Sequence, residues 1–384
     1  MKIVADVQIP RVEQVFAGFG EIVVCESRDI IPALVRDADV LLIRSVTRVD
    51  AALLGKSNIR FVASATSGID HIDTGYLEDH SIGFASAHGC NAGAVAEYVL
   101  SALCSLSEEN GFQLQEKKMG IIGCGCIGSR LLGMATTMGM ETIVNDPPLA
   151  AKTGDNLYRP LNEIFNADII SLHVPYHSGS AYPTHHLVDS GFLEKLKPGC
   201  ILINTSRGGV VSESALKESM QEKDLCVILD VWENEPDFDQ ELFSSVRIGT
   251  PHIAGYSLDA KLRATAMIYN AVCEYFGLEA NQQRTDNSDI QSSSVIDLVD
   301  TAKETGKVVN HVVLSHYDVR KDARDFGMNS KPARSCPGDQ FDNWRKNYSM
   351  RREFPATTVR CSRENEKLTG QLQQLGFNVE LISK

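Results

Sequence analysis

Three residues whose side chains could act together, Arg207, Glu235 and His252, each follow a short apolar run in the second half of the chain. The three runs are Cys200–Asn204, Val227–Val231 and Arg247–Gly249. A guanidinium presents a planar fork to a carboxylate, and an imidazole can accept a hydroxyl proton near neutral pH. A carboxylate beside the imidazole would orient the ring and favour its charged form. Together these groups suit the removal of a hydride from a 2-hydroxy acid.

Each of these residues also has an ordinary structural explanation. Arg207 could be a surface arginine, and His252 could be a structural residue of its loop. Glu235 could be a solvated loop acid, and Glu233 is a competing carboxylate two positions away. The functional interpretation rests on their conjunction, because ligands of open parallel sheets bind beyond the carboxyl ends of the strands.

The segment Gly123-Cys-Gly-Cys-Ile-Gly128 matches the pattern G-x-G-x-x-G. It follows an apolar run and opens a helical pattern at Ile127–Gly139, and Asp146 ends the next apolar run. In this context the glycines indicate a turn that holds a pyrophosphate at a helix N-terminus. Asp146 would accept hydrogen bonds from the adenosine ribose and repel the additional phosphate of NADP, so we expect NAD. The alternative is a glycine turn in a flavodoxin-like fold that binds no dinucleotide.

The composition of the 384-residue chain argues against some classes of partner. Lys and Arg number 37 and Asp and Glu 50, so the net charge is −13, which disfavours general binding to nucleic acid or anionic membranes. The first residues lack a signal-peptide core, and no apolar run is long enough to span a membrane. The ten cysteines include no Cys-x-x-Cys pair, so we expect reduced thiols and a cytoplasmic protein. No ligand spacing predicts a metal site.

Two stretches of the chain alternate short apolar runs with helical patterns, which predicts two parallel sheets with helical crossovers. In the first stretch, we expect strands at Met1–Ala5, Val40–Ile43 and Phe61–Ala65 and a helix at Ile30–Ala38. A helical pattern at Ala92–Leu106 precedes the second stretch. Its expected strands are Met119–Gly123, Glu141–Asn145, Ala167–His173 and the three runs named above.

The composition changes after a long helical pattern at Leu258–Phe276. The polar segment Glu279–Ser294 predicts a boundary or an exposed linker. Beyond this linker we expect a small α+β unit, with strands at Val312–Ser315 and Thr357–Val359 and a helix at Glu364–Leu375.

At the residues described first, the sequence resembles the D-isomer-specific 2-hydroxyacid dehydrogenases. The matching motifs are N-x-x-R-G around Arg207, D-V-[FW]-x-x-E-P around Glu235 and T-P-H-I-A-G around His252. The resemblance implies that these three residues are catalytic and that Asp230 lies near the nicotinamide. The complete set of expected cofactor contacts is Gly123, Gly125, Cys126, Ile127, Gly128, Asp146, His173, Val174, Thr205, Ser206, Asp230 and Gly255.

One branch of this family matches further motifs along nearly the whole chain. They include Ile43–Thr47, Ala65–Asp73 and Gly89–Ala92, and in the tail Tyr317–Arg320, Arg345–Tyr348, Arg351–Glu353 and Leu375–Asn378. The tail resembles a C-terminal dimerisation domain, so the resemblance implies a homodimer. The expected substrate contacts are Arg44, Ser45, Thr66, Ser67, Gly68 and Tyr256. Among them, Arg44 could grip a phosphate or be a surface residue.

The resemblance implies two Rossmann-like α/β domains and a small α+β domain. They are a flavodoxin-like substrate-binding domain at 1–92 and 258–280, an NAD-binding domain at 93–257 and a dimerisation domain at 281–384. The implied reaction is NAD-dependent oxidation of 4-phospho-D-erythronate to (R)-3-hydroxy-2-oxo-4-phosphooxybutanoate in pyridoxal 5'-phosphate (vitamin B6) biosynthesis. Two alternatives stay open. One is another D-2-hydroxyacid dehydrogenase, such as one acting on 3-phosphoglycerate, and the other is a non-enzymatic NAD-responsive protein of the corepressor type.

Overall fold

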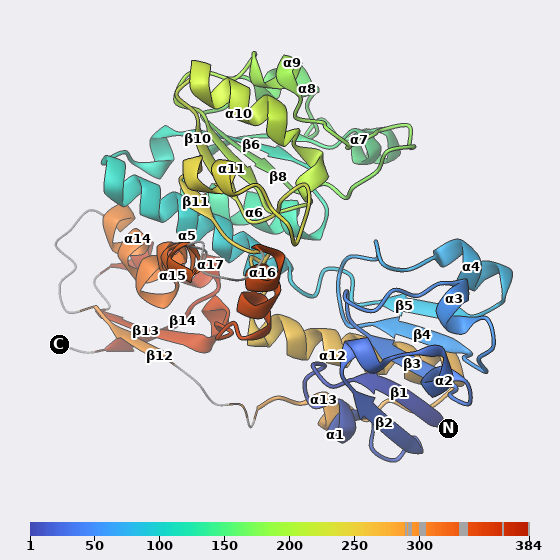
Figure 1. Cartoon of the computed structure of the whole chain (residues 1–384). Coiled ribbons are helices and arrows are strands. Elements are labelled where there is room, and N and C mark those ends of the chain that lie inside the picture. Colours follow the sequence, from blue (N-terminus) through green and yellow to red (C-terminus); the bar gives the residue numbers. More distant parts are fainter. Residues whose placement is uncertain (289, 291–293, 299–304, 330–336, 363–364, 383–384) are drawn as a thin grey trace. The chain divides into compact units, whose positions relative to one another are not determined.

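The computed structural model (Figure 1) describes residues 1–288, 290, 294–298, 305–329, 337–362 and 365–382. The chain divides into two compact units, each built on its own parallel sheet. The first unit comprises Met1–Asn91 and Ser257–Ser292, and the second comprises Ala92–Tyr256 and Ser293–Lys384. Two parallel-sheet α/β folds were expected, and the structure confirms them.

The first unit holds a five-stranded parallel sheet in the order β2-β1-β3-β4-β5 (Figure 1). The strands are β1 (Lys2–Asp6), β2 (Glu21–Cys25), β3 (Val40–Ile43), β4 (Phe61–Ser64) and β5 (Gly83–Ser86). Its helices are α1 (Val12–Phe16), α2 (Pro32–Val35), α3 (Ala51–Leu54), α4 (Thr74–Asp79), α12 (Leu258–Phe276) and α13 (Gln282–Thr285), with a 3-10 turn η1 (Ser27–Asp29). Residues of β3 and β4 are buried on both faces, because α12 and α1 cover one face and the shorter helices cover the other.

The second unit holds a six-stranded parallel sheet in the order β11-β10-β9-β8-β6-β7. The strands are β6 (Lys118–Ile122), β7 (Glu141–Asn145), β8 (Ile169–Leu172), β9 (Ile201–Asn204), β10 (Cys226–Leu229) and β11 (Ile248–Gly249). Its helices are α5 (Ala92–Asn110), α6 (Cys126–Thr137), α7 (Pro147–Thr153), α8 (Leu161–Ile164), α9 (Ser190–Leu193), α10 (Glu213–Glu222) and α11 (Gln240–Ser245), with 3-10 turns η2 (Leu114–Glu116) and η3 (Gly208–Val210). The strand order changes direction between β6 and β8, which is where such sheets bind ligands.

The C-terminal segment belongs to the second unit and carries a small parallel sheet in the order β12-β13-β14. Its elements are β12 (Ser294–Asp297), α14 (Thr305–His316), α15 (Val319–Asn329), α16 (Pro337–Lys346), η4 (Phe354–Ala356), β13 (Thr357–Ser362), α17 (Glu366–Leu375) and β14 (Asn378–Ile382). The buried Leu368, Leu372 and Phe354 lie in the same hydrophobic core as residues of α5 and β6. The segment is therefore packed onto the second unit rather than joined to it only by the chain.

The strand expected at Val312–Ser315 is wrong, because these residues lie in the helix α14. The buried Val308, Val309, Val312 and Val313 recur at helical spacing and form one face of this helix. The preference of valine for strands is a weaker effect than the burial of its side chain in a core. Packing of this face against α5 therefore decides the structure. The helix expected at Ile30–Ala38 is also shorter, with α2 limited to Pro32–Val35.

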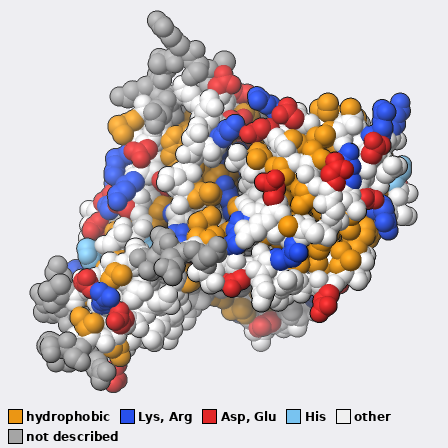
Figure 2. Space-filling view, turned by 90° about the horizontal axis from the view of Figure 1, so that it is seen from below, with side chains coloured by type: hydrophobic (Ala, Val, Ile, Leu, Met, Phe, Trp, Pro, Cys, Tyr) orange, Lys and Arg blue, Asp and Glu red, His pale blue; other side chains and the backbone are white. Residues whose placement is uncertain are grey.

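Further properties of the chain concern its cysteines, its helices and its surface charge. The cysteines that the structure describes are free, and Cys336 lies outside the described residues. Among the described helices, none is long and apolar enough to cross a membrane. Figure 2 shows Lys and Arg side chains with Asp and Glu side chains between them. On the coloured part of that face, charges of both signs are therefore mixed.

The shared core predicts that the C-terminal segment unfolds together with the second unit. Leu372 is fully buried in this core, whereas Leu157 is 43 % exposed. We expect Leu372→Ala to lower the free energy of unfolding by about 2–5 kcal/mol. The matched Leu157→Ala should change it by less than about 0.5 kcal/mol. Urea unfolding followed by circular dichroism measures both, and equal effects of the two substitutions would contradict the shared core.

Candidate active site

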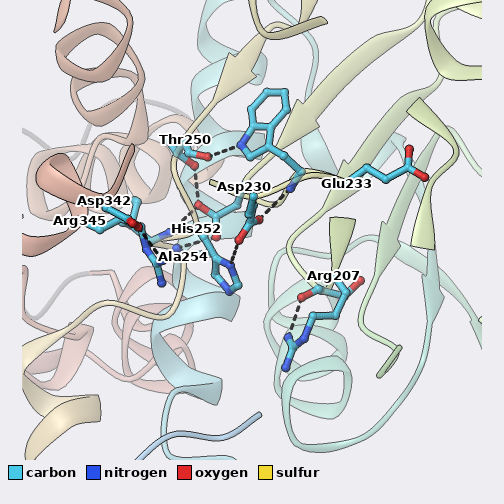
Figure 3. Close-up of polar contacts among 12 residues, drawn as sticks. Arg207, Asp230, Glu233, Thr250, His252, Ala254, Asp342 and Arg345 are labelled. Carbon is cyan, nitrogen blue, oxygen red and sulfur yellow. Dashed lines mark hydrogen bonds and ion pairs between the residues drawn. The ribbon is translucent and has the colours of Figure 1, made fainter. Parts of the chain in front are cut away.

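Three adjacent strands of the second sheet, β9, β10 and β11, end in loops that carry Arg207, Glu235 and His252. All three strands are parallel, so their carboxyl ends lie at one edge of the sheet. Figure 3 shows the side chains of Arg207 and His252 projecting from their loops toward the same side of the view. The structure therefore places all three residues after strands that end at one edge of the sheet, and it brings Glu235 and His252 into contact.

Glu235, rather than Glu233, is the carboxylate that contacts the histidine. Its Oε2 lies 2.7 Å from His252 Nδ1, and its Oε1 accepts a hydrogen bond from the backbone N–H of Trp232 at 2.8 Å. Glu233 instead lies 2.5 Å from His186 Nε2. A carboxylate at Nδ1 fixes the orientation of the imidazole and leaves Nε2 as the ring atom that can exchange a proton with a ligand.

The environment of Glu235 keeps this carboxylate charged. Burial by itself would raise the pKa of Glu235, but His252, the Trp232 N–H and the charge of Arg345 together lower it below its usual range. An ionised Glu235 would stabilise positive charge on His252 when that ring takes up a proton. The pair therefore has the electrostatics of a general base and its orienting acid.

Asp230 anchors the loop that carries His252. This carboxylate is 1 % exposed and accepts hydrogen bonds from Thr250 Oγ1 at 2.6 Å and from the N–H groups of Ile253 and Ala254 at 2.8 Å each. The backbone N–H of His252 also donates to the carbonyl of Asp230 at 2.6 Å. These bonds hold His252 at a φ of +56°, a left-handed conformation that non-glycine residues rarely adopt. The geometry of the loop therefore depends on one buried acid.

Burial dominates the charge state of Asp230. It raises the pKa of this carboxyl, although His252, Thr250 and the two N–H groups act in the opposite direction. Both carboxylate oxygens of Asp230 are engaged within the loop. Its expected proximity to the nicotinamide stays a prediction, while its contacts in the structure are those of an anchor.

Two half-buried arginines of the C-terminal segment support the same loop, and neither is among the site residues expected from the sequence. Arg351 donates to the carbonyls of Ala254 at 2.8 Å and Tyr256 at 3.0 Å. Arg345 of α16 donates to Tyr256 Oη at 2.9 Å. The sequence places both arginines in tail motifs and in a locally basic segment, but long-range contacts of this kind leave no mark in local spacing.

The glycine turn after β6 has the geometry expected for phosphate binding. Gly123 has a φ of +90°, and a Cβ there would lie 2.5 Å from the carbonyl oxygen of His173. A Cβ at Gly128 would lie 2.0 Å from the carbonyl oxygen of Gly123, so only glycine allows this approach of strand and helix. A Cβ on Gly125 would meet nothing within 4 Å. The turn thus leaves space beside the N-terminus of α6, where a pyrophosphate would bind.

The residues around this turn fit a dinucleotide. Asp146 follows β7, and its Oδ2 accepts a hydrogen bond from the N–H of Cys124 at 2.7 Å, which places the carboxylate against the glycine turn. His173 Nδ1 and Thr205 Oγ1 are buried polar atoms without a hydrogen-bond partner in the structure. Burial lowers the pKa of His173 to about 3, so its ring is neutral. Polar atoms of this kind at the ends of β8 and β9 suit contacts with a bound ligand.

The expected substrate contacts in the first unit follow two adjacent strands. Arg44 comes after β3, and its Nε lies 3.3 Å from Oδ2 of the buried Asp6. Thr66 follows β4, and its hydroxyl donates to the carbonyl of Gly68 at 3.2 Å. The hydroxyl of Ser67 accepts from the N–H of Gly89 at 3.1 Å. Ser45 is exposed, and Tyr256 belongs to the second unit.

Two other kinds of site are a reactive cysteine in the glycine turn and a metal site built from histidines and other ligands. Burial and the charge of Asp146 raise the pKa of Cys124, so this thiol is not activated as a nucleophile. Within the described ranges, no group of three or more His, Cys, Asp or Glu side chains could hold a metal ion.

Sequence comparisons relate the chain to known families. Residues 94–254 match the family described as "D-isomer specific 2-hydroxyacid dehydrogenase, NAD binding domain". Residues 291–376 match a domain of unknown function (DUF3410). The chain is 40 % identical over 386 residues to the erythronate-4-phosphate dehydrogenase of Chromohalobacter salexigens, covering 100 % of both chains. It is 42 % identical over 380 residues to the enzyme of that name from Pseudoalteromonas atlantica, covering 98 % and 100 %.

Solved structures share the fold over about three quarters of the chain. A formate dehydrogenase of Staphylococcus aureus in complex with NAD aligns with a TM-score of 0.61 at 23 % identity, covering 74 % of this chain and 98 % of that one. A 3-phosphoglycerate dehydrogenase of Entamoeba histolytica with bound NAD aligns with a TM-score of 0.60 at 24 % identity, covering 72 % and 95 %. At this identity, the alignments support the architecture alone.

The role of Asp230 as an anchor can be tested by stability. Asp230→Asn keeps the size of the side chain, but it replaces one of the accepting carboxylate oxygens with an amide NH2 group, which donates. We expect it to lower the free energy of unfolding by about 1–3 kcal/mol, the cost of leaving buried groups unsatisfied. The exposed Asp224 supplies the control, and Asp224→Asn should change stability by less than about 0.5 kcal/mol. Thermal unfolding of the two variants decides this, and an unchanged Asp230→Asn would contradict the anchoring role.

Proposed function

Because this chain belongs to the erythronate-4-phosphate dehydrogenases of the D-isomer specific 2-hydroxyacid dehydrogenase family, we propose that it oxidises 4-phospho-D-erythronate. The product is (R)-3-hydroxy-2-oxo-4-phosphooxybutanoate, and the step belongs to pyridoxal 5'-phosphate (vitamin B6) biosynthesis. The cofactor is NAD, whose family-specific binding domain covers residues 94–254. The observation that carries the proposal is the 2.7 Å contact between Glu235 and His252 at the strand edge that also bears Arg207.

The chemistry follows from the three strand-end residues. Arg207 binds the substrate carboxylate and orients C2, since its planar fork matches the two carboxylate oxygens. His252 Nε2 takes the proton of the C2 hydroxyl while Glu235 holds Nδ1 and stabilises the charge that the ring gains. Bound NAD supplies the acceptor for the hydride that leaves C2. The hydroxyl carbon thereby loses two electrons and one hydrogen and becomes the carbonyl carbon.

The cofactor would be held by residues of the second unit at the carboxyl edge of its sheet. The glycine turn Gly123–Gly128 and the N-terminus of α6 suit the pyrophosphate, and Asp146 suits the adenosine ribose. The other proposed contacts are His173, Val174, Thr205, Ser206, Asp230 and Gly255. Because these residues lie on buried strand ends, water would be excluded from the path of the hydride.

The proposed substrate contacts are Arg44, Ser45, Thr66, Ser67, Gly68 and Tyr256. Arg44 carries the positive charge suited to the phosphate, and Asp6 holds its guanidinium by the Nε contact at 3.3 Å. Ser45, Thr66 and Tyr256 would donate or accept hydrogen bonds, and Ser67 and Gly68 would contribute backbone groups. Residues 1–92 and 258–280 would thus form the substrate-binding domain and 93–257 the NAD-binding domain.

A homodimer through residues 281–384 is part of the same proposal. The three-stranded sheet buries one face, since β13 alternates fully buried with half-buried residues. On its neighbouring strands, Val295 is 44 % exposed and Ile382 is 40 % exposed. These apolar side chains on the open face of the sheet support its pairing with a second copy of the chain.

The free thiols of the described cysteines support a reducing, cytoplasmic location.

The direct test is formation of NADH from 4-phospho-D-erythronate, compared with 3-phosphoglycerate at equal concentration. A 2-oxo acid should be added in a parallel assay, so that any tightly bound NADH is reoxidised. The proposal predicts a higher kcat/KM for 4-phospho-D-erythronate. Preference for 3-phosphoglycerate would identify the other hydroxyacid dehydrogenase, and failure to oxidise any hydroxy acid would favour a binding protein.

The base role of His252 predicts a separation of catalysis from cofactor binding. His252→Asn removes the proton acceptor, so kcat should fall by about 100-fold or more. The affinity for NAD, measured by calorimetry, should change by less than about threefold, because the ring does not lie on the glycine turn. The neighbouring His186→Asn, which removes the partner of Glu233, is the control and should keep most of the activity. Similar losses in both variants would argue against the assignment.

A further inference from the structure

Arg345 is a nearly buried cation beside the proposed active site. It lies on α16, its side chain is 20 % exposed, and its guanidinium carbon lies 5.5 Å from the ring centres of both Tyr256 and Phe341. Its Nη2 donates to Tyr256 Oη at 2.9 Å. Figure 3 shows Arg345 and Asp342 next to the loop that bears His252 and Ala254. The residue therefore reaches the site from a segment outside the matched NAD-binding domain.

Burial opposes the charged form of Arg345, but Tyr256, Glu235 and Asp342 raise its pKa above the usual range, so Glu235 is one of the groups that balance this charge. The ion pair of Arg345 in the described structure joins Nη1 to Asp342 Oδ1 at 3.9 Å, and that acid is 66 % exposed. Its Nε is buried without a hydrogen-bond partner. Arg320 of α15 offers the contrast, because at 23 % exposure it binds both oxygens of Asp318 at 2.8 and 2.9 Å. Arg345 is thus less satisfied than expected for an arginine that serves only to hold the fold.

The positive charge of Arg345 acts on Glu235. The charged groups that interact with Glu235 include His252 of the loop, Arg345 of α16 and Glu213 of α10, whose carboxyl also interacts with Glu233. Burial would raise the pKa of Glu235, and the charge of Arg345 is among the causes that lower it. The arginine therefore favours the ionised state of the acid that orients His252.

We propose that Arg345, supplied by the C-terminal segment, is a positioning residue of the dehydrogenase reaction. It fixes the Tyr256 hydroxyl in the site and adds a positive charge that keeps the Glu235–His252 pair in its working state. This inference rests on the proposed function. It gives the domain of unknown function a role in catalysis that is separate from any role in pairing subunits.

The test compares three variants of the whole protein. Arg345→Gln removes the charge and the planar fork, Arg345→Lys keeps the charge but loses the fork, and Arg320→Gln removes an equally shielded arginine elsewhere in the C-terminal segment. The quantity measured is the pH dependence of kcat and KM for oxidation of 4-phospho-D-erythronate. Thermal unfolding in the same buffers separates losses of stability from changes in catalysis.

The expected effects differ between the variants. In Arg345→Gln, the pair takes up its proton more readily, so the acid limb of kcat/KM should move to higher pH by about one unit. Arg345→Lys should restore the acid limb but keep a KM raised about tenfold, which corresponds to about 1.4 kcal/mol, because Tyr256 is no longer held. Arg320→Gln should leave both unchanged. An unshifted acid limb in Arg345→Gln, or the same shift in Arg320→Gln, would overturn the proposal.

A second readout keeps this inference distinct from the proposed function. The side-chain carboxyl of Glu235 can be followed by NMR in protein labelled with ¹³C-glutamate and assigned with Glu235→Gln. Its titration midpoint should lie at higher pH in Arg345→Gln than in the unmodified protein or in Arg320→Gln. If the unmodified protein does not oxidise 4-phospho-D-erythronate, the proposed function fails and this titration still decides the role of Arg345. An unmoved midpoint would overturn it.

Discussion

The arrangement of the site depends on one buried carboxylate, Asp230, because the loop after β11 folds around it and donates hydrogen bonds to it. Its oxygens accept from Thr250 Oγ1 and from two successive backbone N–H groups, and its carbonyl accepts from His252. A buried acid is costly unless its acceptors are used. The loop therefore closes around Asp230, and in doing so it holds His252 in a left-handed conformation beside Glu235.

The rest of the second unit reinforces this constraint from two directions. From α5, the hydroxyl of Tyr98 lies 2.6 Å from Thr250 Oγ1, which connects the main core to Asp230. From the C-terminal segment, Arg351 binds the carbonyls of Ala254 and Tyr256. The core shared by α5, α14 and α17 places both supports in the same packed body. The geometry of the loop that carries His252 and the packing of the C-terminal segment are thus coupled through hydrogen bonds.

Local patterns predicted much of this structure and missed what depends on distant contacts. The glycine turn and the strand-end positions of Arg207 and His252 were predictable, because apolar runs and glycines act over a few residues. Residue types alone left Glu233 and Glu235 as competing carboxylates, and only the family motif favoured Glu235, because their partners His186 and His252 depend on the path of the loop. The apolar run at Val312–Ser315 predicts a strand although it is helical, because burial of the α14 valines against α5 has no signature in a short window. The roles of Arg345 and Arg351 likewise arise only when the tail packs on the second unit.

The orientation of His252 by Glu235 for proton transfer can be measured by comparing Glu235→Gln with Glu233→Gln. Both substitutions remove one charge from the same loop and keep the size of the side chain, and the measured quantity is kcat for oxidation of 4-phospho-D-erythronate. We expect a fall of about 100-fold or more for Glu235→Gln, which loses the charged partner of the ring. We expect a fall of less than about fivefold for Glu233→Gln, whose partner is His186. Equal losses, or a larger loss in Glu233→Gln, would contradict this role of Glu235.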